Sequence, residues 1–369
     1  MDFSFSEEQQ LLRDSVTRFI RQDYGFETRQ KTVTSSEPFN YRYWQMFAEL
    51  GWLLVPFCEE DGGLGGSAVD LMVVMEEFGK GMVVEPLLAS AILAGGLIAE
   101  AGSDAQKSDW LFPLMEGNLQ LAFAFAEPQS RYDLSNLATT AETDGDDFTL
   151  RGHKTVVLNG GAADILVVSV RTTSGVSLLI VDANTPGITR NSYKTVDGHN
   201  AAEIYFDSVH VPRANLLGGE GEALPVIEKI VDRATFAICA EAVGAMESAL
   251  YKTVEYTKTR KQFGVTISSF QALQHRMADM FIECQQARSI LMMAAMQLDT
   301  GNGVAPKAVS AAKSRIGKAA RKVGQEAVQI HGGIGVTDEL DVAHLFKRLT
   351  SIQYVFGSTD YHTQRFIRG

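Results

Sequence analysis

Cysteine is scarce in this chain. Its 369 residues include three cysteines, Cys58, Cys239 and Cys284, which lie far apart and form no Cys-x-x-Cys pair. Closely paired cysteines are typical of zinc and redox sites, and an even set behind a signal peptide is typical of a disulfide framework. An odd and scattered set instead predicts reduced thiols, which fits a cytoplasmic protein.

The chain also lacks the features of exported and membrane proteins. It begins MDFSFSEEQQ, without the basic start and apolar core of an export signal. Its longest apolar stretch, AILAGGLIA at 91–99, is well short of the ~20 residues that a membrane helix needs. We therefore expect no membrane insertion.

Positive charge is in deficit. The chain has 33 Lys and Arg against 45 Asp and Glu, a formal net charge of −12. Because nucleic-acid binding depends on clustered Lys and Arg that neutralise phosphates, we expect no nucleic-acid partner. With 45% apolar and 21% charged residues, the composition is that of an ordinary globular protein.

Three segments of different periodicity follow one another. Residues 1–118 carry apolar residues at helical spacing, whereas residues 119–216 alternate between turns, as in a β-sandwich or barrel. Helical spacing returns over residues 217–369. The sequence therefore predicts an α+β multidomain protein: an N-terminal α-helical domain, a middle β domain and a C-terminal helical bundle.

Individual helices can be placed within these segments. Ser6 and Gln9 form a capping box at the start of the first helix. In the N-terminal segment, further helices are expected over 41–54, 68–78 and 85–101. In the last segment, helical spacing runs from Gly218 to about Arg260, and two more helices are expected over 270–300 and 305–330.

Two short motifs in the last third have the chemistry of a dinucleotide site. The first is RKQFG at 260–264, and the second is QIHGGIGVT at 329–337. Glycines let backbone N–H groups approach a pyrophosphate, and Arg260 could add charge-assisted hydrogen bonds. Each motif alone is more often an ordinary turn between helices.

Taken together and in this order, the motifs resemble the acyl-CoA dehydrogenase family of flavoproteins. The resemblance covers the whole chain through FSFSEEQQLLRDSV, FAELGWLLVPFCEEDGGLGG, EPLL, NGG, RKQFG and QIHGGIG. It implies a helical, β and four-helix-bundle architecture, FAD as cofactor, an acyl-CoA substrate, and electron-transfer flavoprotein as electron acceptor. The residues that match family contacts to a neighbouring subunit's FAD are Arg260, Phe263, Gln271, Gln329, Gly332 and Gly333.

The family's catalytic base has no counterpart in the expected place. The resemblance puts a Glu in a Tyr-Glu-Gly-Thr loop, where this chain has Val355–Ser358 with Phe356 opposite the Glu. A second family location for the base falls on Ala234, and nearby Asp232 matches a contact to the pantetheine arm of CoA. Asp360 and Glu241 are fallback candidates, although the preferred interpretation of Glu241 is a paired polar residue between helices. The catalytic residue stays unknown at this stage, and the loop is expected to be remodelled and non-catalytic.

The β segment shows parallel losses of family contacts to a subunit's own flavin. Where the family has Thr-Glu-Pro, this chain has Ala126 in place of the threonine. Before NGG, Val156 and Leu158 stand in place of the family's aromatic residue and threonine. The chain is thereby similar to small subunits of heteromeric acyl-CoA dehydrogenases of the pimeloyl-CoA dehydrogenase type. This predicts a second acyl-CoA dehydrogenase chain as partner in a heterotetramer that desaturates an acyl-CoA to an enoyl-CoA.

Three alternatives remain open from the sequence. One is a homo-oligomeric dehydrogenase with a displaced carboxylate base. Another is a non-dehydrogenase flavoprotein of the same fold, such as a lyase or desulfinase, and the third is a structural partner that binds no ligand.

Overall fold

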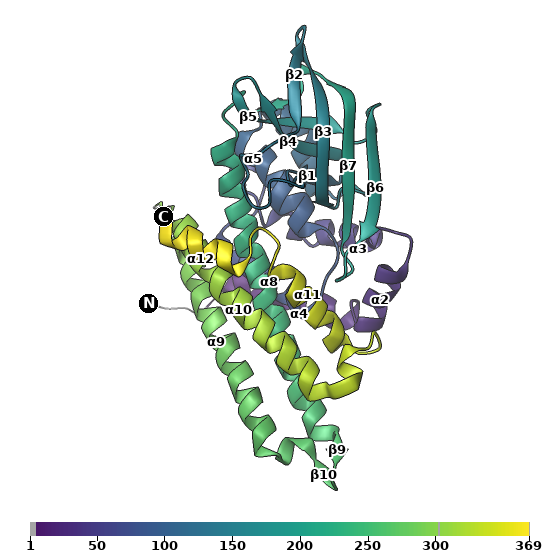
Figure 1. The fold of residues 1–369 in the computed structure, drawn as a ribbon, viewed down its shortest axis with the longest axis vertical. Helices are drawn as coiled ribbons and strands as arrows, with labels where there is room; N and C mark the ends of the chain where they lie inside the picture. Colours follow the sequence, from purple (N-terminus) through teal and green to yellow (C-terminus); the bar gives the residue numbers. More distant parts are fainter. Residues whose placement is uncertain (1–4, 302, 369) are drawn as a thin grey trace. The chain divides into compact units, whose positions relative to one another are not determined.

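The computed structural model describes residues 5–301 and 303–368, which divide into two compact units. One unit combines the chain up to Gln30, Ala68–Val83 and the chain from Thr235 onward. The other combines Lys31–Ser67 with Val84–Ala234. The first unit is therefore a helical bundle to which two N-terminal helices contribute, and the second contains the sheet (Figure 1).

Long helices that run side by side build the first unit (Figure 1). The predicted capping box is confirmed, since Ser6 Oγ accepts from Gln9 N at 3.2 Å and Gln9 Oε1 from Ser6 N at 3.1 Å. The predicted C-terminal helices are confirmed to within a few residues. The helices are α1 (Glu7–Gln22), α4 (Ala68–Gly81), α8 (Leu224–Thr259, which continues from the second unit), α9 (Gln271–Thr300), α10 (Ala305–His331), α11 (Asp341–Ile352) and α12 (Thr359–Arg368), with short 3-10 turns at Ile267–Ser269 and Gly332–Val336.

Helices α4 and α8 touch backbone to backbone through two glycines. A Cβ at Gly79 would lie 1.9 Å from the carbonyl oxygen of Glu241, and a Cβ at Gly244 would lie 1.8 Å from the carbonyl oxygen of Glu76. No side chain fits at such distances, so each helix presents a glycine where the other presents a peptide group.

Short helices accompany the sheet in the second unit. The helix expected over 41–54 ends at Glu49 because Gly51 takes a left-handed φ of +76°, which closes the helix. The segment expected as a helix over 85–101 is π-helical at Leu87–Gly95 before becoming α5. The elements are α3 (Tyr41–Glu49), α5 (Gly96–Ala101), α6 (Asp104–Gln106) and α7 (Phe112–Met115), π-helical Leu87–Gly95 and Lys107–Leu111, and 3-10 turns at Trp52–Leu54, Glu59–Asp61 and Arg213–Asn215; α2 (Phe26–Thr34) crosses between the units.

The β segment forms one eight-stranded sheet in the order β6-β7-β3-β2-β4-β5-β8, with β1 parallel to β4. Its two long strands, β3 and β7, pair antiparallel, with register shifts between Leu150 and Gly152 and between Lys154 and Val157. Apolar side chains on the inner face of the sheet are buried, as in Phe148 and Leu150. The strands are β1 (Leu121–Ala124), β2 (Thr140–Asp144), β3 (Asp147–Leu158), β4 (Ile165–Thr172), β5 (Gly175–Asp182), β6 (Ile188–Lys194), β7 (Asn200–Val211) and β8 (Leu216–Leu217).

A buried ion pair lies beside the sheet at the segment that begins with Ala126. Lys154 Nζ donates to Glu127 Oε1 at 2.7 Å, and both side chains are essentially inaccessible. Glu127 also accepts from the backbone N–H of Ala138 at 2.6 Å and of Thr139 at 3.2 Å. Burial would raise the pKa of Glu127, but Lys154 and these donors lower it to about 2. The pair therefore ties both ends of the 127–139 loop to β3.

The α+β architecture predicted from the sequence is confirmed: helical segments precede and follow the sheet segment along the chain. Among the described residues, no helix combines the length and the apolar character that crossing a bilayer demands.

Alanine at either contact glycine should destabilise the bundle strongly. Gly79→Ala and Gly244→Ala force a methyl group into a backbone oxygen, so we expect each to lower the free energy of unfolding by about 3 kcal/mol or more. Urea denaturation measures the loss. The matched control is Gly96→Ala, whose Cβ would meet Ile230 at an ordinary 3.4 Å. A loss at Gly79 no larger than at Gly96 would contradict the close packing.

The Glu127–Lys154 pair should make stability fall in acid. Lys154 keeps its proton through the acid range, because burial lowers its pKa only to about 8. Glu127 has a lowered pKa, so its contribution is complete above the usual value of 4.5 and is lost as the pH falls towards about 2. Glu127→Gln should cost ~3–5 kcal/mol at neutral pH by leaving a buried ammonium unpaired. The double variant Glu127→Gln/Lys154→Met should cost less and show a shallower acid slope; equal losses in the single and double variants would contradict the pairing.

Candidate functional site

A β-hairpin follows α8 and projects from the end of the bundle (Figure 1). Its strands, β9 (Lys261–Gln262) and β10 (Val265–Thr266), pair antiparallel across Phe263 and Gly264. Both turn residues have positive φ, +55° and +84°, as a two-residue hairpin requires, although Phe is an unusual choice there. Phe263 is 91% exposed, with its ring edge-to-face on Phe270 at 6.1 Å. Arg260 and Gln271, which flank the hairpin, are exposed as well.

The second predicted motif lies at the C-terminal end of α10. Gly332 has φ +69° and ψ −145°, a combination essentially limited to glycine. Its N–H donates back to the carbonyls of Val328 and Gln329, so it serves the helix end. Gln329, Gly332 and Gly333 are all exposed. Of the two glycines, only Gly333 is therefore a candidate to donate its backbone N–H to a ligand.

The fold brings the two motifs to one end of the bundle. Tyr256, four residues before Arg260, stacks on His331 with ring centroids 4.3 Å apart, and its hydroxyl donates to the His331 carbonyl at 3.4 Å. His331 Nδ1 donates to the Ala327 carbonyl at 2.8 Å, and burial lowers the pKa of His331. A neutral imidazole and a phenol ring thus lock the end of α8 to the end of α10. A guanidinium, an exposed ring and exposed glycines fit a dinucleotide chemically.

The turn between α11 and α12 contains the position where a base was expected. Phe356 is buried, and the residues around it from Val355 to Ser358 include no acid. Asp360 is exposed in the first turn of α12. His362, near the start of α12, is buried and hydrogen-bonded to the Phe356 carbonyl at 3.0 Å.

The other fallback candidate, Glu241, is fully engaged in an ion pair. Arg348 of α11 donates from Nε to Oε1 at 2.5 Å and from Nη2 to Oε2 at 2.7 Å, and both residues are buried. This geometry favours the alternative of a paired polar residue between helices. The sequence analysis did not identify Arg348 as a partner of Glu241. The feature that could have indicated it is a cation within the apolar face of α11, beside Leu345 and Leu349. Asp232 is buried in the part of α8 that belongs to the second unit.

In the second unit, a polar network surrounds Val156, one of the positions at which the family resemblance places a flavin contact. Val156 has φ +49° at the register shift in β3 and is half-exposed. Glu203 of β7 accepts from Thr155 Oγ1 at 2.7 Å and from Val156 N at 3.4 Å, and it pairs with His153 Nε2 at 2.6 Å. The pKa of Glu203 is lowered by these donors against its burial. The network fixes the conformation of β3 at Val156.

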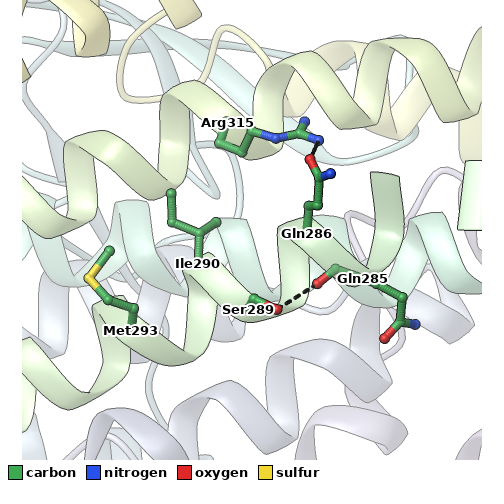
Figure 2. Close-up of a pocket in the computed structure, with 6 residues that line it drawn as sticks. All are labelled: Gln285, Gln286, Ser289, Ile290, Met293 and Arg315. Atoms are coloured by element: carbon green, nitrogen blue, oxygen red, sulfur yellow. Dashed lines mark hydrogen bonds between the residues drawn. The ribbon is translucent and has the colours of Figure 1, made fainter. Parts of the chain in front are cut away.

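A shallow groove of about 550 Å³ runs along α9 and α10 (Figure 2). Arg315 of α10 reaches across and donates to Glu283 and Gln286 of α9, each at 2.5 Å. Ile290 and Met293 form the apolar part of its lining (Figure 2). On the same helix, Phe281 and Ile282 are about half-exposed, so α9 carries an uncovered apolar surface in this chain.

Comparison with known proteins agrees with this architecture along the whole chain. Models of the N-terminal, middle and C-terminal domains of acyl-CoA dehydrogenases match residues 6–118, 122–209 and 222–369. Probable acyl-CoA dehydrogenase YngJ of Bacillus subtilis is 33% identical over 358 residues, which cover 94% of this chain and 93% of that protein.

Two solved structures are similar over nearly their full lengths. Butyryl-CoA dehydrogenase from Megasphaera elsdenii has a TM-score of 0.90 at 29% identity, with 100% of this chain and 99% of that chain covered. A chain of the ChsE4-ChsE5 complex from Mycobacterium tuberculosis has a TM-score of 0.91 at 26% identity, with 100% and 98% covered. This chain belongs to the acyl-CoA dehydrogenase family.

Proposed function

We propose that this chain is one subunit of a heteromeric, FAD-dependent acyl-CoA dehydrogenase that converts an acyl-CoA to an enoyl-CoA. The reaction removes a proton from Cα and a hydride from Cβ of the thioester, and bound FAD supplies the hydride acceptor. In the proposed assembly, a second acyl-CoA dehydrogenase chain provides the base, and this chain completes that chain's FAD site. Electron-transfer flavoprotein is the proposed acceptor, and the free thiols support a reducing, cytoplasmic setting.

One observation carries the proposal: the chain exposes its dinucleotide motifs but presents no acid at the turn where the base is expected. Phe356 cannot accept a proton, and both oxygens of Glu241 are bound by Arg348. A carboxylate held in this way is a poor base, because protonating it would leave a buried guanidinium unpaired. A complete site therefore needs an acid from elsewhere.

The residues proposed to contact the FAD of the second chain are all on the surface. Arg260 suits the pyrophosphate, and Phe263 offers a ring face to the adenosine end. Gln271, Gln329 and Gly333 complete the proposed contact set together with Gly332, whose N–H serves the helix end but whose lack of a side chain allows close approach. Phe263 would be costly to leave in water, so its 91% exposure supports a role in binding another molecule.

A surface suited to a second chain also exists. Ile290 and Met293 line the groove on α9 and α10 (Figure 2), and α9 also exposes Phe281 and Ile282. Exposed apolar side chains of this kind are typical of the central part of a subunit interface. One similar structure is titled as a complex of two named chains, ChsE4 and ChsE5. The pimeloyl-CoA dehydrogenase small-subunit type is our proposal for the subclass, with Asp232 as a substrate contact.

Replacing Arg260 should weaken flavin retention by the two-chain complex. We expect Arg260→Ala, coexpressed with the second chain, to raise the Kd for FAD about tenfold or more, because a charge-assisted hydrogen bond to pyrophosphate is lost. Flavin content and FAD titration of the purified complex measure this. Arg18→Ala, an exposed arginine of α1, is the control; equal FAD affinity in both variants would contradict the assignment.

Replacing Asp360 should leave catalysis intact. If Asp360 were the base of a homomeric enzyme, Asp360→Asn would slow flavin bleaching by an acyl-CoA by about a hundredfold or more. We expect less than about a twofold change in the complex, since Asp360 is exposed outside the buried turn. The measurement is the stopped-flow rate of flavin bleaching without an electron acceptor. A large decrease in this rate in Asp360→Asn would favour the homomeric alternative.

A further inference from the structure

A strained turn joins α11 to α12. Phe356 has φ +59°, a left-handed conformation that costs a bulky residue of order 1–3 kcal/mol. Gly357 follows with φ +126°, and a Cβ there would lie 2.5 Å from His362 Nε2 and 2.6 Å from Tyr361 Cδ1. A conformation of this kind persists only where the surroundings over-determine it.

Two buried side chains from different helices hold the main chain of this turn. Lys313 of α10 donates from Nζ to the carbonyl oxygens of Ile352 and Gly357, each at 2.8 Å, and to that of Gln353 at 3.4 Å. His362 of α12 contacts the intervening carbonyl, that of Phe356, at 3.0 Å. Each of the two side chains belongs to a residue that is 1% exposed.

The protonation of both groups suits these contacts. Burial, followed by the charge of Lys313, lowers the pKa of His362 to about 4, so the imidazole is neutral near neutral pH. Its Nε2–H then donates to Phe356, and its Nδ1 accepts from the Ser310 hydroxyl at 3.3 Å. Burial lowers the pKa of Lys313 to about 8, which leaves an ammonium at the negative end of α11.

Every acceptor in the Lys313 and His362 contacts to the turn is a backbone carbonyl. Hydrogen bonds to the main chain do not depend on which side chains the turn carries. Two of the four carbonyls, those of Ile352 and Gln353, lie at the C-terminal end of α11, where carbonyls lack partners within the helix.

We propose that Lys313 and His362 are positioning residues that hold the 353–358 turn in one conformation whatever side chain stands at position 356. The family resemblance places a catalytic carboxylate at this position. In this chain the position carries Phe356, and the contacts of Lys313 and His362 to the main chain are made without it. The inference goes beyond the proposed function, since it concerns this chain without flavin or a second subunit.

Hydrogen–deuterium exchange on the full-length chain tests the proposal. The reporters are the amides of Val355 and Gly357, which donate to the carbonyls of Ser351 at the end of α11 and of Tyr354 in the turn. In the wild-type chain we expect them to exchange at least about tenfold more slowly than the amide of Gly264 in the exposed hairpin. Exchange as fast as that of Gly264 would overturn the proposal without any variant.

Matched variants assign the effect to each positioning residue. Lys313→Met should speed exchange of the reporters about tenfold or more, whereas Lys318→Met, an exposed lysine on the same helix, should leave it unchanged. His362→Leu should speed exchange, and His362→Gln should restore slow exchange because its amide can donate to the Phe356 carbonyl.

Two results would contradict the assignment. If the Val355 and Gly357 amides exchanged no faster in Lys313→Met than in Lys318→Met, Lys313 would not hold the turn. If their exchange were accelerated equally in His362→Leu and His362→Gln, the hydrogen bond of His362 would not hold it. Should Lys313→Met fail to fold, the His362 pair and the wild-type measurement still decide. A change in FAD retention plays no part in this test, so its outcome is separate from that of the Arg260 experiment.

Discussion

The backbone contact between α4 and α8 sets the positions of the bundle's buried charges. With Gly79 against the Glu241 carbonyl and Gly244 against the Glu76 carbonyl, both carboxylates start from the same close crossing. Glu241 then reaches Arg348 of α11, and Glu76 lies 3.2 Å from Arg288 of α9. One helix crossing thereby positions ion-pair partners on two further helices. If α4 and α8 lay farther apart, the buried carboxylates would not reach their cations. An unpaired buried carboxylate costs far more free energy than the loss of apolar contact.

This constraint connects the scaffold to the function. The pairing with Arg348 keeps Glu241 from acting as a free base and at the same time places α11, whose end leads into the 353–358 turn. At the other end of the same bundle, the Tyr256–His331 stack joins the two motifs proposed to bind FAD. The bundle thus combines a turn that carries no acid with an exposed surface proposed to contact another chain's cofactor, which is the division of roles expected of a subunit that works in a pair.

Much of this was readable from the sequence, because it rests on local patterns. Helical periodicity predicted α8, α9 and α10, the Ser6–Gln9 capping box predicted the start of α1, and the two motifs were recognised from their residues. The long-range partners were not readable. Arg348 and Lys313 lie in apolar stripes, where a lysine or arginine gives no indication of which carboxylate or carbonyl the fold brings to it. The burial of His362 was not readable either, because it depends on packing against α10, which no local pattern encodes.

The central claim is that this chain lacks a working base of its own, and a visible absorption spectrum tests it most directly. The chain is purified alone, reconstituted with FAD, and mixed anaerobically with acyl-CoA thioesters of several chain lengths. The account predicts weak flavin retention and no bleaching of the oxidised flavin band, with bleaching only after the second chain is added. Full, rapid bleaching by the lone chain would contradict it.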